Sequence, residues 1–215
     1  MFGPLRSEVE SRFASIESYF SATKDFQGDL AATAKGLMFI QVYAAYEYTV
    51  KGVVRTAIES INSRRHRMID ISPRLLPLYL DPELSSLRDC GRRHVWSARR
   101  AIFERAFSAD FVTLPSDTGP PTDGSHYRAS HLWIILSVFN IRRRPARKMQ
   151  HLTRINEVVN YRNEIAHGTD TAENVGRRYT RAEIWHMERQ MKSVCTNLIS
   201  IFDGFCANPS RHRRR

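Results

Sequence analysis

The C-terminal third of the chain carries an apolar pattern that only a helix gathers on one side. Apolar residues recur in alternating steps of three and four, at Ile184, Met187, Met191, Val194, Leu198, Ile201 and Phe205. An α-helix turns this spacing into one continuous stripe, whereas a strand would scatter it over both faces. Thr180 and Glu183 have the spacing of a capping box, so the helix is expected to begin near residue 180. Such a stripe packs against a neighbouring helix or another subunit.

Helical patterns also fill most of the remaining sequence. We expect helices over 5–20, 30–62, 81–91, 95–107, 129–139 and 146–167, separated by Gly, Pro and polar residues, with a polar loop over 168–179. For 129–139 a helix is preferred because its neighbours are helical, although a strand also fits this short apolar run. The sequence therefore predicts an all-α, up-and-down helical bundle with a helical and loop insertion in the middle.

The expected organisation is a single domain over residues 1–207. The Pro-rich and Gly-rich stretch of about 63–128 interrupts the helical pattern and is interpreted as the insertion, and residues 208–215 as a basic, disordered tail. The longest strongly apolar run, Leu132 to Phe139, is far shorter than the roughly 20 residues that cross a bilayer. No signal-peptide pattern opens the chain, and Cys90, Cys195 and Cys206 lack zinc-ligand spacing. We expect a cytoplasmic protein without a membrane partner.

Charge indicates the class of ligand. In 215 residues, Lys and Arg number 33 and Asp and Glu 22, a net charge of +11, while 42% apolar residues suffice for a core. An excess this basic favours polyanions, with nucleic acid first and anionic membranes second. Arginine dominates the excess, and its planar fork binds phosphate better than the point charge of lysine does.

Two charged residues lie in stripes that are otherwise apolar. Arg162 follows Ile155 and Val159 on one face of the 146–167 helix, and Glu47 precedes Val50 and Val54 on the long helix. Glu47 either pairs with Lys51, four residues on, or reaches across to Arg162. Arg162 and His167 in turn belong either to a buried structural pair and a helix end, or to a polar site.

The surrounding residues resemble a known family. The run Arg162-Asn163-Glu164-Ile165-Ala166-His167-Gly168 looks like the RNxxxH signature of the HEPN superfamily. The segment from Tyr43 to Lys51, with Glu47 between aromatic and aliphatic residues, resembles the long early helix of RiboL-PSP-type HEPN proteins. The order of elements, with two N-terminal helices, a variable middle, a motif helix and a final helix, agrees with that family over most of the chain.

This resemblance implies a HEPN-like bundle that acts as a metal-independent endoribonuclease. Two subunits would form a homodimer with one composite site. His167 would exchange protons near neutral pH, Arg162 would neutralise the phosphate, and Asn163 would orient the histidine or bond a phosphate oxygen. Glu47, with Lys51 beside it, would position Arg162. No metal and no cofactor is expected.

The resemblance also implies RNA as the substrate. Candidate phosphate contacts are Arg64, Arg65, Arg142, Arg143 and Arg144, and the aromatic residues Trp96, Tyr127, Trp133 and Trp185 would stack bases. A toxin or antiviral-defence role, with an antitoxin or regulatory protein as partner, is the expected context. Some HEPN toxins carry a tyrosine two residues after the histidine that a partner modifies; Thr169 stands there, so this control is not expected. The alternatives are a non-catalytic HEPN module for dimerisation or for RNA or nucleotide binding, and a basic structural RNA-binding bundle.

Overall fold

The all-α prediction is confirmed. The computed structural model describes residues 1–115, 118–121, 126–208 and 212–213, and these contain helices and no sheet. The elements, in chain order, are α1 (Gly3–Ala22), α2 (Gly28–Asn62), the short 3-10 helix η1 (Met68–Asp70), α3 (Leu76–Tyr79), α4 (Asp81–Asp89), α5 (Val95–Ala106), α6 (Ala129–Val138), α7 (Met149–Ala166), α8 (Ala172–Arg177) and α9 (Arg181–Cys206).

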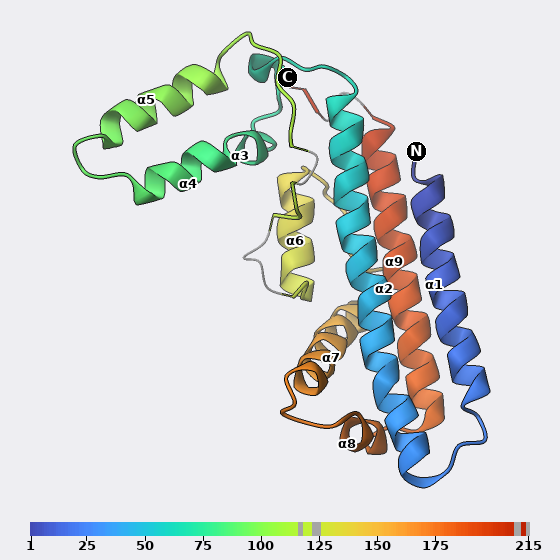
Figure 1. The fold of residues 1–215 in the computed structure, drawn as a ribbon. Coiled ribbons are helices and arrows are strands. Elements are labelled where there is room, and N and C mark those ends of the chain that lie inside the picture. Colours follow the sequence, from blue (N-terminus) through green and yellow to red (C-terminus); the bar gives the residue numbers. More distant parts are fainter. Residues whose placement is uncertain (116–117, 122–125, 209–211, 214–215) are drawn as a thin grey trace.

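Three long helices, α1, α2 and α9, lie side by side and form the body of the bundle (Figure 1). The apolar stripe predicted for the last helix is buried, with Ile184, Met191 and Phe205 fully inaccessible and Ile201 half-buried. It packs against α2 and α1 of the same chain. Thr180 accepts a hydrogen bond from the backbone N–H of Glu183, whose carboxylate accepts one from the backbone N–H of Thr180, so the predicted capping box is present.

The short helix α8 lies where a polar loop was expected, so that expectation was wrong. It packs closely against α2 through two glycines, because a Cβ on Gly36 would overlap the carbonyl of Ala172 and one on Gly176 would overlap the carbonyl of Ala32. Six residues are too few to reveal a periodic stripe. The backbones meet because both glycines lack a side chain, and this contact forms only in three dimensions.

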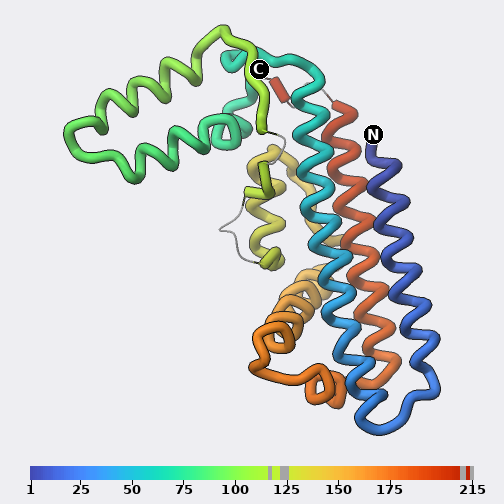
Figure 2. Tube along the Cα trace, in the orientation of Figure 1, coloured from blue at the N-terminus to red at the C-terminus, as the bar shows by residue number. Residues whose placement is uncertain are grey.

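Helices α3, α4 and α5 form an arm that projects sideways from one end of the bundle (Figures 1 and 2). The arm lies within residues 63–128, the expected insertion. After α5 the chain returns along α2, where the Asn62 side chain bonds both the carbonyl and the N–H of Leu114 at 2.8 and 2.9 Å. Figure 2 shows this returning segment leading to α6. Leu114 and Tyr127 are buried against the bundle.

Part of the expected tail is packed against the fold. Residues 209–211 and 214–215 lie outside the described residues, but His212 is fully buried, with its ring 4.6 Å from that of Phe205. The Ser72 N–H donates to the carbonyl of His212. Burial first, then nearby Arg64 and His66, lower the pKa of His212 to about 4. His212 therefore fills an apolar position as a neutral imidazole, and disorder of the tail 208–215 stays a prediction.

Among the residues that the structure describes, every helix is either too short or too polar to span a membrane.

Candidate functional site

The end of α7 presents His167 to solvent. The helix ends at Ala166, His167 is the C-cap residue, and Gly168 adopts the left-handed conformation (φ +71°), which glycine does without a steric penalty. The backbone N–H groups of Thr169 and Asp170 both donate to the carbonyl of Glu164, which closes the helix end. These bonds fix the backbone on either side of His167, and its imidazole stays exposed.

An aromatic cluster fixes the C-terminal half of α7 against α2 and α9. The ring of Tyr161 lies 5.1 Å from that of Phe39 on α2 and 5.8 Å from that of Tyr179, just before α9. Lys35 donates to the carbonyl of Tyr179, and the Tyr179 hydroxyl donates to Glu157. These contacts set the rotation of α7 about its axis, and that rotation decides where Arg162 points.

Arg162 is half-buried and contacts side chains of its own chain. Its Nη1 donates to Oδ1 of Asn163 and to Nε2 of His126, at 3.2 Å in both cases. The guanidinium carbon lies 4.9 Å from the centre of the Tyr43 ring, a cation–π arrangement. The guanidinium thus has one defined orientation, which a bidentate phosphate ligand requires. Asn163 orients the arginine, whereas the sequence suggested that it would orient the histidine or bond phosphate.

His126 is a member of this group that the sequence did not reveal. It precedes α6 in the returning loop, and its Nδ1 lies 3.1 Å from the Tyr43 hydroxyl. Because a guanidinium only donates, Nε2 of His126 accepts, so the imidazole is neutral and its Nδ1–H donates to Tyr43. Burial, and then the charge of Arg162, lower the pKa of His126, in keeping with the neutral form. No periodicity marks a histidine in a loop, so only the fold brings it here.

Tyr43 remains a neutral hydroxyl beside these groups. Burial, followed by the negative charge of Glu47, raises the pKa of Tyr43 to about 12, although Arg162 acts in the opposite direction. His167 and Glu47 also contribute to the electrostatic environment of His126, so the motif histidine lies within electrostatic reach of the Arg162 group. The site therefore combines a fixed cation, a fixed neutral imidazole and an exposed imidazole.

Glu47 forms an ion pair with Lys51, with Oε1 and Nζ 2.8 Å apart. Of the two alternatives left open by the sequence, the structure contains the pair within α2, and the hydrogen bonds of Arg162 to described residues go to His126 and Asn163. The hydrogen bond and charge of Glu47 raise the pKa of Lys51. Glu47 and Arg162 act in opposite directions on the pKa of Tyr43, which Glu47 raises and Arg162 lowers.

The candidate phosphate contacts fall in two places. Arg142, Arg143 and Arg144 are exposed in the connection between α6 and α7. Arg64 and Arg65 follow α2, at the end of the bundle where α9 also ends. Arg65 is exposed, but Arg64 points inward, where its Nη2 donates to the carbonyl of Cys206 at 2.6 Å. Arg64 therefore holds the end of α9 rather than offering a free cation.

Among the residues that the structure describes, no group of three or more His, Cys, Asp or Glu side chains is arranged to hold a metal ion.

The comparisons with known proteins identify the family to which the chain belongs. The family model described as HEPN_MAE_28990-like HEPN matches residues 3–210. The chain therefore belongs to the HEPN family. Neither a curated protein nor a solved structure gave a significant match.

Proposed function

We propose that the protein is a metal-independent endoribonuclease of the HEPN type. The observation that carries the proposal is the end of α7, where one helix holds a half-buried, oriented Arg162 and an exposed His167 five residues later. An oriented guanidinium neutralises a phosphate as charge develops on it, and an accessible imidazole exchanges protons near neutral pH.

The proposed reaction is attack of a ribose 2′-hydroxyl on the adjacent 3′-phosphate. The 2′-oxygen bonds to phosphorus as the bond from phosphorus to the 5′-oxygen of the next nucleotide breaks. The 2′-hydroxyl loses one proton and the leaving 5′-oxygen gains one, so the products are a 2′,3′-cyclic phosphate and a 5′-hydroxyl end. His167 transfers protons, and Arg162, held by Asn163, stabilises the charge of the pentacoordinate phosphate. Glu47 and Lys51, paired on α2, lie next to these groups.

The proposed active form is a homodimer in which the exposed ends of two α7 helices supply one composite site. A dimer brings two copies of His167 to one phosphate, so that one accepts a proton while the other donates one. We further propose a toxin or antiviral-defence role, with an antitoxin or other regulatory protein controlling the enzyme.

The direct test is cleavage of a single-stranded RNA in the presence of EDTA. We expect cleavage with cyclic phosphate and 5′-hydroxyl ends, and a loss of at least about 100-fold in rate for His167→Ala. His186→Ala, which removes another exposed histidine on α9, is the matched control and should leave the rate unchanged. Cleavage that persists in purified His167→Ala would refute the assignment.

One observation favours the second candidate, a non-catalytic HEPN module for dimerisation or for RNA or nucleotide binding. The guanidinium of Arg162 already contacts three side chains of its own chain, Asn163, His126 and Tyr43. Arg162→Lys separates the two functions, because lysine keeps the charge but loses the fork. An enzyme loses rate at unchanged thermal stability, whereas a structural arginine loses stability.

A further inference from the structure

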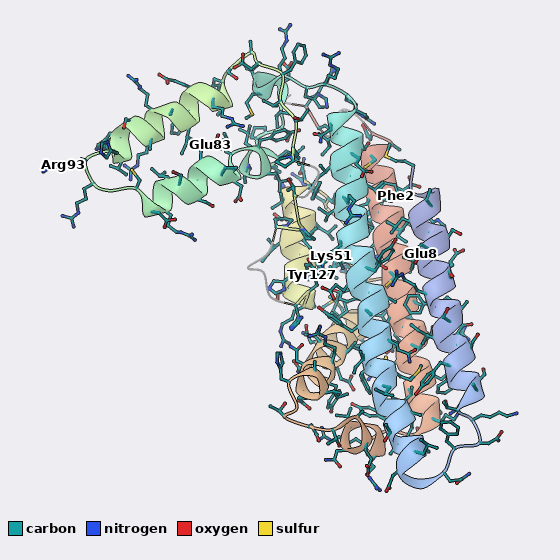
Figure 3. The ribbon with its side chains drawn as sticks, viewed as in Figure 1. Phe2, Glu8, Lys51, Glu83, Arg93 and Tyr127 are labelled. Atoms are coloured by element: carbon teal, nitrogen blue, oxygen red, sulfur yellow. The ribbon has the colours of Figure 1, made fainter. Side chains whose placement is uncertain are left out.

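Helices α4 and α5, the outer part of the arm, are unusually exposed for folded elements. Every residue of α4 is at least partly accessible, and α5 buries only Ile102 and Ala106. The two helices contact each other, and the arm joins the rest of the chain through α3 and η1. An ion pair between Arg105 and Glu83 ties α5 to α4 (Glu83 is labelled between them in Figure 3). Helices of 9 and 12 residues are marginal without packing, so a partner on the free face would stabilise them.

The exposed face of the arm carries aromatic rings. Trp96 is 74% exposed and Phe103, seven residues later on the same face of α5, is 66% exposed. Phe111, 62% exposed, continues the surface at the base of the arm. Apolar rings this accessible are unusual on a monomer surface and mark a binding site when they cluster.

Arginines lie between and over these rings. The guanidinium of Arg99 is 4.8 Å from the centre of the Trp96 ring, and those of Arg65 and Arg67 are 5.6 and 5.5 Å from the centre of Phe111. Arg92 and Arg93 are exposed at the outer end of the arm, where Figure 3 labels Arg93.

The carboxylates of α5 do not neutralise this charge. Glu104 pairs with Arg100 at 3.3 Å. Within the described part of the chain, Arg92, Arg93 and Arg99 form no ion pair with a carboxylate. The free face therefore carries rings together with uncompensated guanidinium groups.

We infer that this face of the arm, defined by Trp96, Phe103, Phe111, Arg92, Arg93 and Arg99, is a binding surface for single-stranded RNA. Unpaired bases stack on aromatic rings, and arginines beside the rings bind the phosphates that connect the bases. A protein partner that covered the rings would have to desolvate the arginines, whereas a polyanion neutralises them. The interleaving of rings and cations therefore favours a nucleic acid over an apolar protein surface.

The inference rests on the proposed function only in taking RNA as the ligand, because the arm is separate from the end of α7 (Figure 1). Its test uses binding and not cleavage. The full-length His167→Ala variant keeps the oligonucleotide intact, and fluorescence anisotropy measures its affinity for a labelled single-stranded RNA of mixed sequence.

In this background, Trp96→Ala with Phe103→Ala should weaken binding at least about tenfold, as expected for two stacked bases. Both side chains are exposed, so circular dichroism should not change. The matched control is Phe26→Ala, which removes an exposed ring from the connection between α1 and α2 and should leave affinity unchanged. Arg92→Gln with Arg93→Gln should lower the slope of log affinity against log salt by about 1.4, and Arg189→Gln on α9 should not change it.

A second readout follows stacking directly. Single-stranded RNA should quench part of the tryptophan fluorescence, and Trp96→Phe, which keeps an aromatic ring, should lose that part while retaining most of the affinity.

Unchanged affinity in the Trp96/Phe103 variant, or equal loss of affinity for double-stranded RNA, would overturn the inference. So would arm variants that change only the oligomeric state in sedimentation, since the arm would then be an interface between copies. If the wild type never cleaves RNA but arm variants still lose RNA binding, the proposed function fails and the arm inference stands. If the wild type cleaves RNA but the arm variants keep full RNA affinity, the arm inference fails and the proposed function stands.

Discussion

Glu188 on α9 offers a quantitative test of the packing between α9 and α1. Its side chain is fully buried, and neither carboxylate oxygen has a hydrogen-bond partner among the residues that the structure describes. Burial, and then the negative charge of Glu17, raise its pKa from 4.5 to about 7, although Lys192 acts in the opposite direction. The Lys192 ammonium is bound by Glu17 at 2.6 Å, so it does not neutralise Glu188.

This raised pKa fixes how stability depends on pH. Well below pH 4.5 the carboxyl of Glu188 is protonated in both the folded and the unfolded chain, so its ionisation does not change the free energy of unfolding. As the pH rises from 4.5 to about 7, the unfolded chain loses the proton first, so the free energy of unfolding falls. The difference between the two pKa values corresponds to about 3 kcal/mol at pH 8, and the loss is complete above about pH 7.

Glu188→Gln removes the ionisation and keeps the shape. Urea unfolding followed by circular dichroism should show the variant about 3 kcal/mol more stable than the wild type at pH 8 and within about 0.5 kcal/mol of it at pH 4. Glu10→Gln, an exposed position on α1, is the control and should leave the pH profile of stability unchanged. A Glu188→Gln variant that is equally stable or less stable at pH 8 would refute the reasoning, because it would place the carboxylate in a solvated or paired position.

Three further predictions concern the scaffold and use thermal or urea unfolding. Gly176→Ala should destabilise the protein by about 1–3 kcal/mol because the added Cβ overlaps the Ala32 carbonyl. Gly204→Ala, which has open space around the added methyl, is the control and should be neutral or stabilising. Equal effects of the two substitutions would contradict the close contact of α8 with α2. Thr180→Ala removes the capping box and should cost about 1 kcal/mol, and no loss would mean that α9 begins elsewhere. Tyr46→Phe leaves the Tyr127 carbonyl, 2.9 Å away, without its donor and should cost about 1–2 kcal/mol, a loss that a solvated carbonyl would not show.

Local patterns were sufficient for the long helices. The stripe from Ile184 to Phe205, the capping box at Thr180 and the left-handed Gly168 are each encoded within a few residues, and the structure contains all three. The family was likewise recognisable from the motif around Arg162, and the match over 3–210 agrees with it.

Long-range contacts were not predictable in this way. His126 reaches Arg162 only because the returning loop follows α2, and 36 residues separate the two. The choice of Lys51 over Arg162 as the partner of Glu47 depends on the rotation of α7, which the aromatic cluster of Tyr161 sets. Burial of His212 depends on a packing site that α9 and the segment after α2 build together.

Helix α2 passes both the candidate site and the root of the arm, and its stiffness has a geometric consequence. From Tyr43, which contacts Arg162, to Asn62, which anchors the chain returning from the arm, the helix rises about 28 Å. Because one continuous helix joins the two regions, the distance between them is fixed. A bound strand must be at least that long before both regions hold it at once. Oligonucleotides below that length should bind only one of the two regions at a time, and affinity should step upward once the strand spans the interval.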